Sequence, residues 1–156
     1  MIRVEIPGRV RPLELTHVVL DFNGTIAVDG VLLPEAAERI RRLKDLVQLH
    51  VLTADTYGSV RGQCEGLGVE VHTFPRAGAG LCKRDIVAEL KDGVACFGNG
   101  LNDIPMFGLA TLSVAVMEGE GLCGRLVAHA DVVVRSAAEG LDLLLCPDRL
   151  RATLRN

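Results

Sequence analysis

Short apolar runs alternate with amphipathic stretches along most of this sequence, and that alternation is the feature that most restricts its fold. The apolar runs are rich in valine, leucine and isoleucine, and their length is typical of buried strands. In order they are THVVLDF at 16–22, QLHVLTAD at 48–55, VEVHTF at 69–74, GVACFGN at 93–99, LSVAVM at 112–117 and DVVV at 131–134. We expect each run to form a strand.

Helical patterns occupy the intervals between these strands. They are EAAERIRRLKDL after Pro34, residues 56–66, LCKRDIVAEL at 81–90, a short helix from about Asn102, GLCGRLVAHA at 121–130 and SAAEGLDLLL at 136–145. Strands that alternate with helices form βαβ units and a parallel sheet with helices on both faces. The sequence therefore predicts an α/β fold, a Rossmann-like three-layer α/β/α arrangement with a mostly parallel sheet.

The two ends of the chain differ from this pattern. MIRVEI and residues 13–16 flank a Pro-Gly turn, which favours an N-terminal β-hairpin. The segment RLRATLR at 149–155 is typical of the last turns of a helix. A length of 156 residues suits one domain. We expect a hairpin over 1–16, a catalytic-type core over 17–146 and a helical tail over 147–156.

Composition excludes several classes of protein. No apolar run approaches the ~18–20 residues that span a bilayer, and the N-terminus has no signal pattern. The net charge of −3 comes with scattered basic residues, which argues against nucleic acid as the partner. The five cysteines are far apart in the sequence and include no Cys-x-x-Cys pair, so we expect buried thiols rather than disulfides or a zinc site. The four histidines have no spacing typical of a metal site. We expect a soluble, cytoplasmic protein with no membrane partner.

Polar residues follow several of the predicted strands, where the ligand sites of open parallel sheets lie. They are Asp21, Asn23, Thr53, Asp55, Asn99, Asn102 and Asp103. Asp21 could act as a nucleophile, bind Mg²⁺ or cap a turn. Thr53 could bind an anion or cap a helix. The role of Asp55, ligand contact or helix cap, stays open.

Two further features could bind a charged ligand, one an anion and the other a cation. Lys83 lies near the start of a predicted helix, where it could offset phosphate charge or remain an ordinary surface lysine. The oxygen-rich loop FGNGLND at 97–103 suits a hard cation such as Mg²⁺, although it could also be an ordinary Asn-Gly turn.

The order of these motifs resembles the haloacid dehalogenase superfamily. DFNGT, then VLTAD, then Lys83, then GNGLNDIPMF is most similar to the phosphorylation domain of P-type ATPases, and the resemblance runs from Thr16 to about Leu145. It implies a phosphoryl group on Asp21, with Asn23, Thr53 and Lys83 completing the catalytic set.

The resemblance also implies two binding sets. The phosphate would contact Gly24, Thr53, Ala54, Lys83 and Asn102. The Mg²⁺ ion would be held by Asp21, Asn23, Asn99 and Asp103. Phosphoryl transfer needs an in-line nucleophile, a cation and donors aimed at the equatorial oxygens, and these residue types supply all three.

Two positions depart from the pattern of the resembled phosphatases. Asn23 stands where those enzymes usually carry a second aspartate, the general acid and base. An amide cannot transfer protons in that way, so turnover should be slow and should favour good leaving groups, such as acyl or aryl phosphates. Asn99 stands where the family usually has a magnesium-binding aspartate, so we expect weaker metal binding.

The spacing of the motifs leaves no room for a cap domain. The intervals from Thr25 to Thr53 and from Thr53 to Lys83 each hold about one helix and one strand. We therefore expect an open site that accepts a phosphorylated small molecule or macromolecule, or a homo-oligomer such as a tetramer whose subunits cover the site.

The sequence thus favours a Mg²⁺-dependent phosphatase or phosphotransferase that works through an aspartyl-phosphate on Asp21. The alternative is a catalytically weak or inactive relative that binds a phosphorylated ligand or a protein partner. Carbon–halogen hydrolysis through Asp21 has less support, because no cap builds an apolar pocket.

Overall fold

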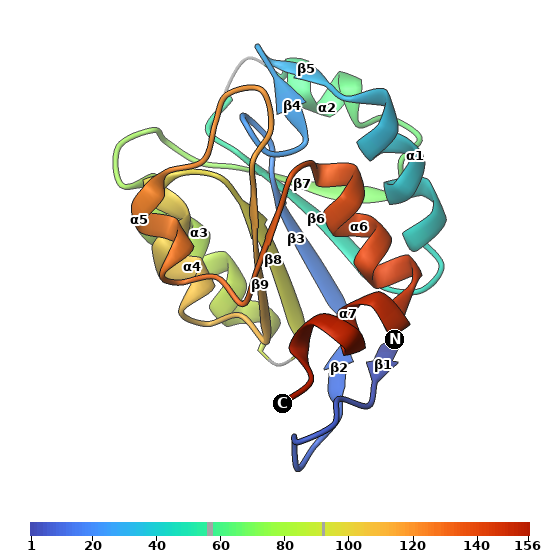
Figure 1. Cartoon of the computed structure of the whole chain (residues 1–156). Helices are drawn as coiled ribbons and strands as arrows, with labels where there is room; N and C mark the ends of the chain where they lie inside the picture. The colour runs from blue at the N-terminus through green and yellow to red at the C-terminus, as the bar shows by residue number, and fades with distance from the viewer. Residues whose placement is uncertain (56–57, 92) are drawn as a thin grey trace.

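Six parallel strands form the central sheet of the protein (Figure 1). The computed structural model describes residues 1–55, 58–91 and 93–156. The strand order is β10-β9-β8-β3-β6-β7. The bounds are β3 (His17–Asp21), β6 (Gln48–Thr53), β7 (Val69–Thr73), β8 (Val94–Gly98), β9 (Leu112–Val116) and β10 (Val132–Val134). The six runs predicted as strands are thereby confirmed, as is the mostly parallel sheet.

Helices cover both faces of this sheet, which completes the predicted three layers. One layer contains α1 (Pro34–Leu43) and α6 (Ala137–Leu145), and the other contains α3 (Ala79–Leu90), α4 (Ile104–Phe107) and α5 (Gly124–Val127) (Figure 1). Side chains of β3 alternate between the layers: Val18 and Leu20 pack in the cluster with α1 and α6, and Val19 in the cluster with α3 and α4. This alternation is the two-residue period of a strand buried on both faces.

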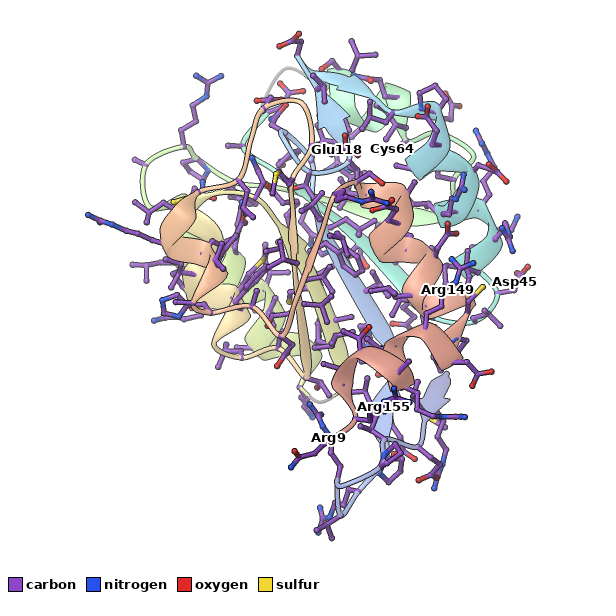
Figure 2. The ribbon with its side chains drawn as sticks, in the orientation of Figure 1. Arg9, Asp45, Cys64, Glu118, Arg149 and Arg155 are labelled. Atoms are coloured by element: carbon purple, nitrogen blue, oxygen red, sulfur yellow. The ribbon has the colours of Figure 1, made fainter. Side chains whose placement is uncertain are left out.

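Local signals explain where the helices of the first layer begin. Pro34 occupies the first turn of α1, where a missing N–H is harmless. The Ser136 hydroxyl accepts a hydrogen bond from Glu139 N at 3.0 Å and caps α6. Glu118 lies at the same end of α6 and accepts a hydrogen bond from Ala137 N at 2.8 Å (Figure 2).

The predicted N-terminal hairpin is present. Strands β1 (Ile2–Val4) and β2 (Leu13–Leu15) pair antiparallel, and their alternate side chains are buried. The expected helical tail is α7 (Pro147–Leu154), which packs against β1 and α6. The two ends of the chain therefore lie close together at the amino edge of the sheet (Figure 1).

Several predicted elements differ in extent. The helix expected over 56–66 is α2 (Ser59–Gln63), and residues 56–57 lie outside the described ranges. The helix expected over 121–130 is only α5, a single turn. The short helix expected from about Asn102 consists of a 3₁₀ turn (Leu101–Asp103) followed by α4.

A second hairpin was not predicted. Strands β4 (Ala27–Val28) and β5 (Val31–Leu32) pair antiparallel around Asp29 and Gly30. Both turn residues have positive φ, 52° and 75°, which is the conformation that Asp-Gly favours in a two-residue hairpin. The Asp-Gly pair was therefore a readable signal that the sequence analysis passed over.

The described parts of the two intervals, from Thr25 to Thr53 and from Thr53 to Lys83, contain no inserted cap domain. They hold the β4–β5 hairpin, α1 and β6 before Thr53, and α2, β7 and the start of α3 before Lys83. Within the parts of the chain that the structure describes, every helix is too short or too polar to cross a bilayer.

Candidate active site

Three neighbouring strands, β8, β3 and β6, bring the predicted site residues to one edge of the sheet. Asp21 ends β3, Thr53 ends β6, and the loop from Gly98 to Asp103 follows β8. The strand order reverses at this point, because the chain places β6 and β7 on one side of β3 and then β8, β9 and β10 on the other, and such a reversal is the usual ligand position in these folds. A cleft of about 430 Å³ opens there. Its lining comprises Asp21, Asn23, Thr53, Ala54, Phe74, Ala79, Lys83, Asn99, Gly100, Leu101 and Asn102.

Lys83 is buried at the base of the cleft and links its two sides. The ammonium nitrogen Nζ donates to Asp21 Oδ1 at 2.8 Å, to Asn102 Oδ1 at 2.9 Å and to Asp103 Oδ1 at 2.6 Å. Three acceptors match the three protons of an ammonium group. The lysine is therefore not a surface residue: helix α3 holds it against the nucleophile candidate.

Asp103 is fully buried beneath the loop that follows β8. Its Oδ2 accepts hydrogen bonds from Asn99 N at 3.0 Å and Gly100 N at 2.9 Å, and its Oδ1 accepts from Lys83. A Cβ added at Gly98 would lie 2.4 Å from Asp103 Cγ, so only glycine permits this approach. In this geometry Asp103 shapes the loop and positions Lys83, and its role as a metal ligand remains a prediction.

Thr25 connects Asp21 to Asn99 and was not singled out as a site residue. Its buried hydroxyl lies 3.3 Å from Asp21 Oδ2 and 3.2 Å from Asn99 Oδ1. Asn99 Nδ2 donates to Gly121 O at 3.1 Å, which fixes the amide with its oxygen toward Thr25. A Cβ on Gly24 would lie 2.4 Å from that amide nitrogen, so Gly24 lets the two loops touch. The signal for Thr25 was its place in DFNGT.

The Thr53 hydroxyl is oriented by the backbone that follows it. Its oxygen accepts a hydrogen bond from Asp55 N at 3.0 Å, which leaves its proton for an acceptor in the cleft. Asp55 Oδ2 accepts from Ser59 Oγ at 2.8 Å and from Val60 N at 3.3 Å. The carboxylate of Asp55 therefore binds the first turn of α2, and Asp55 also lines the hollow beside Asn23, so ligand contact by Asp55 stays open.

Asn23 is exposed at the mouth of the cleft. It also lines an adjoining hollow of about 330 Å³ together with Arg76, which the sequence analysis had not selected. Phe74 supplies an apolar wall of the main cleft. Neither residue belongs to a recognisable motif, and only the fold brings the 74–79 loop beside the end of β3.

The charges of the buried network are not balanced, and the imbalance falls on Asp21. Burial and the nearby charge of Asp103 raise the pKa of Asp21 to about 7, although Lys83 acts in the opposite direction. For Lys83, burial alone lowers the pKa, but the carboxylates of Asp21 and Asp103 raise it above its ordinary value. One ammonium between two carboxylates leaves one negative charge in excess.

The cleft residues have the donor chemistry of a hard-cation site. Asp21 offers a carboxylate and Asn99 an amide oxygen, and the Thr25 hydroxyl lies within hydrogen-bond distance of both. Asn23 adds amide and backbone oxygens at the mouth of the cleft. Mg²⁺ prefers such oxygen ligands and keeps several waters. Asp21 is the carboxylate that lines the cleft, so the set fits Mg²⁺ with less charge than a site containing two aspartates.

Comparison with known proteins identifies the family. A model of haloacid dehalogenase-like hydrolases matches residues 87–141. The chain is 29% identical over 123 residues to a soluble P-type ATPase-like phosphatase of Methanocaldococcus jannaschii, a match over 76% of this chain and 45% of that protein. It thus spans less than half the length of that relative. It is also 35% identical over 81 residues, 49% of the chain, to an uncharacterised protein of the same organism, of which it covers 87%.

A solved structure gives the same assignment at the level of fold. It is 3-deoxy-D-manno-octulosonate 8-phosphate phosphatase from Moraxella catarrhalis, in complex with a magnesium ion, a phosphate ion and a KDO molecule. The TM-score is 0.72 over 90% of this chain and 94% of that chain, at 17% identity. The protein belongs to the haloacid dehalogenase-like hydrolase superfamily, as the resemblance of its motifs predicted.

The raised pKa of Asp21 predicts a pH-dependent stability. The native protein keeps a proton on Asp21 up to about pH 7, whereas the unfolded chain releases it near the ordinary pKa of 3.8. The free energy of unfolding should therefore fall as the pH rises through this window. Asp21→Asn removes the excess charge. The free energy of unfolding of this variant, relative to the wild type, should therefore increase by about 1–3 kcal/mol between pH 5 and pH 8.

Urea denaturation followed by circular dichroism, with a chelator present, measures this difference. Asp85→Asn is the matched control, because Asp85 is an exposed aspartate paired only with exposed Arg84 among the described contacts. It should leave the pH dependence as in the wild type. An Asp21→Asn variant whose advantage is the same at both pH values would contradict the charge imbalance.

Proposed function

We propose that this protein is a Mg²⁺-dependent phosphatase or phosphotransferase in which Asp21 becomes phosphorylated. The observation that carries the proposal is the position of Asp21 at the base of the cleft, with Lys83 Nζ 2.8 Å away and Thr53 on the neighbouring strand end. The phosphatase name of the Methanocaldococcus relative supports this assignment, as does the phosphate and magnesium complex of the Moraxella enzyme.

The first step would transfer the phosphoryl group to the protein. An oxygen of ionised Asp21 attacks phosphorus, and the bond between phosphorus and the leaving oxygen breaks with its electron pair on that oxygen. The Thr53 hydroxyl and the Ala54 backbone N–H would donate to the equatorial oxygens, and the Lys83 ammonium would offset the negative charge of the nucleophile and the phosphate. These donors are fixed before the substrate arrives, which is how transition-state charge is stabilised most effectively.

The metal would be held by Asp21, an oxygen of Asn23 and the Asn99 amide oxygen. When bound, Mg²⁺ reduces the repulsion between the anionic nucleophile and an anionic phosphate. Asn99 contributes an oxygen without a charge, so binding should be weaker than with aspartate there. Positive charge in the cleft would also favour the ionised form of Asp21, the form that attacks.

The second step would return Asp21 to its free state. Water attacks the phosphorus of the aspartyl-phosphate, the carboxylate leaves, and inorganic phosphate is released. Asn23 can neither protonate the leaving oxygen in the first step nor take a proton from water in the second. We therefore infer slow hydrolysis and a preference for leaving groups that need no protonation, such as acyl and aryl phosphates.

The open cleft bears on the substrate and on assembly. With no cap in the described intervals, a phosphorylated macromolecule could reach Asp21 as readily as a phosphorylated small molecule. Arg76, in the hollow beside Asn23, offers a cation for a second anionic group of either one. In a homo-oligomer such as a tetramer, a neighbouring subunit would cover the cleft.

The proposal predicts that hydrolysis of acetyl phosphate and p-nitrophenyl phosphate requires both Mg²⁺ and Asp21. Asp21→Asn removes the nucleophile but keeps the shape of the side chain, so hydrolysis should fall to the background rate. Asp85→Asn, a charge change of the same kind on the surface, should retain wild-type activity. Release of phosphate or nitrophenol, with and without a chelator, measures the effect.

If neither the wild type nor Asp21→Asn hydrolyses either substrate above the background rate, an enzymatic function is contradicted. The two asparagines would then mark a relative that binds a phosphorylated ligand or a partner. In that case phosphate should still bind to the cleft, and a phosphate titration would detect it.

Restoring the missing acid and base should accelerate turnover. Asn23→Asp places a carboxyl group at the mouth of the cleft, where it can transfer protons to the leaving oxygen and from water. General acid–base catalysis contributes about 10²–10⁴-fold, so kcat for p-nitrophenyl phosphate should rise within that range. An unchanged or lower kcat would show that position 23 does not face the reacting atoms.

A further inference from the structure

Three of the four histidines meet on one face of the sheet, although their spacing in the sequence predicted no metal site. His17 lies on β3, His50 on β6 and His72 on β7, three strands that are neighbours in the sheet. The parallel register of β6 and β7 explains why these side chains meet. His50 lies opposite Glu70, and His72 is two residues beyond Glu70 on the same face of β7. None of the three histidines lines the phosphate cleft.

Two imidazole nitrogens and the two carboxylate oxygens of Glu70 lie close to the spacing of tetrahedral metal ligands. His50 Nδ1 lies 3.1 Å from His72 Nε2 and 3.6 Å from Glu70 Oε2, and His72 Nε2 lies 3.6 Å from Glu70 Oε1. A Zn²⁺ ion about 2.0–2.1 Å from its ligands sets neighbouring tetrahedral ligands about 3.3–3.4 Å apart. The two nitrogens are slightly closer than that value, and each oxygen of Glu70 is slightly farther from one nitrogen, so a small shift that brings one oxygen near both nitrogens would complete the geometry.

The remaining nitrogen of His50 has a partner that orients the ring. His50 Nε2 lies 3.2 Å from His17 Nδ1, so an N–H on Nε2 can donate to His17 and leave the Nδ1 lone pair for a metal. Such an outer hydrogen bond normally accompanies a metal-binding histidine. Burial, then the neighbouring His72 and His17, lower the pKa of His50 to about 4, so the ring is neutral at pH 7, as a ligand must be.

We propose that His50, His72 and Glu70 bind a Zn²⁺ ion that fastens the edge strand β7 to β6. Two imidazoles and one carboxylate suit Zn²⁺, whereas Mg²⁺ prefers an all-oxygen site. Glu70 is largely exposed and His72 partly so, which leaves room for water as the fourth ligand. The role is structural, because the site lies on the strands rather than in the cleft.

The fold explains why β7 would gain from such an ion. It is an edge strand, and none of its five side chains is fully buried. Thr53, at the end of β6, is three residues beyond His50, about 10 Å along the strand. Bound Zn²⁺ should raise the melting temperature by about 5–10 °C at a free concentration about 100-fold above its Kd.

Calorimetric titration of the full chain, stripped of metal and kept in a large excess of Mg²⁺, tests the proposal. The wild type should bind one Zn²⁺ per chain. His72→Ala, at the sheet edge, should abolish this binding and the thermal shift. Glu70→Gln should weaken binding by roughly tenfold or more, because a neutral amide replaces a charged ligand. Circular dichroism checks that both variants are folded.

Two matched variants assign the ion to this site. His129→Ala removes an exposed histidine outside the cluster and should bind Zn²⁺ as the wild type does. Asp21→Asn should also bind normally, since the phosphate cleft is not involved. Nitrogen-detected histidine spectra should show Zn²⁺-dependent shifts at His50 Nδ1 and His72 Nε2.

Three results would overturn the proposal. Zn²⁺ binding that survives His72→Ala would place the ion elsewhere, and binding lost in Asp21→Asn would place it in the cleft. A wild type that binds no Zn²⁺ would leave the three rings as a hydrogen-bonded chain without a metal. None of these results bears on whether Asp21 takes a phosphoryl group.

Discussion

The ammonium group of Lys83, held between the carboxylates of Asp21 and Asp103, is the interaction on which the site depends. Its ion pairs join the end of β3 to the loop after β8. Lys83 itself belongs to α3, in the helix layer that also contains α4 and α5. Removing the lysine would leave two buried carboxylates without their cation, a loss typically of about 3–5 kcal/mol. The same arrangement leaves Asp21 short of positive charge. A cation bound in the cleft would supply the missing positive charge. The charge of Asp21 therefore affects both the stability of the fold and the proposed reaction.

Much of this architecture could be read from the sequence, because strand and helix patterns alternate clearly and polar residues end β3 and β6 and follow β8. What could not be read depended on contacts between distant segments. The sequence predicted Asp103 as a cation ligand, which stays a prediction, but could not predict its contacts with Lys83 and two backbone N–H groups. Thr25 and the histidine cluster gain their partners only when β3, β6, β7 and β8 are in register. The β4–β5 hairpin is different, since its Asp-Gly turn was legible.

The two asparagines give the cleft an unusual balance. The cleft contains the proposed nucleophile, the proposed phosphate donors and the Lys83 hydrogen-bond network, while Asn23 and Asn99 replace two carboxylates of the resembled phosphatases. A site of this kind should favour formation of the aspartyl-phosphate over its hydrolysis, because the first step with an acyl phosphate needs no general acid, whereas the second step is slow without a general base to take a proton from water. The intermediate should therefore outlive that of a phosphatase with an aspartate at position 23.

Direct detection of the aspartyl-phosphate tests the central claim most directly. The protein would be mixed with acetyl phosphate and Mg²⁺, quenched in acid, which preserves acyl phosphates, and digested for peptide mass spectrometry. The account predicts one added phosphoryl group, located on the peptide that contains Asp21 and absent from Asp21→Asn. A wild-type protein that turns over acetyl phosphate with no phosphoryl group on Asp21, or with the group on another residue, would contradict it.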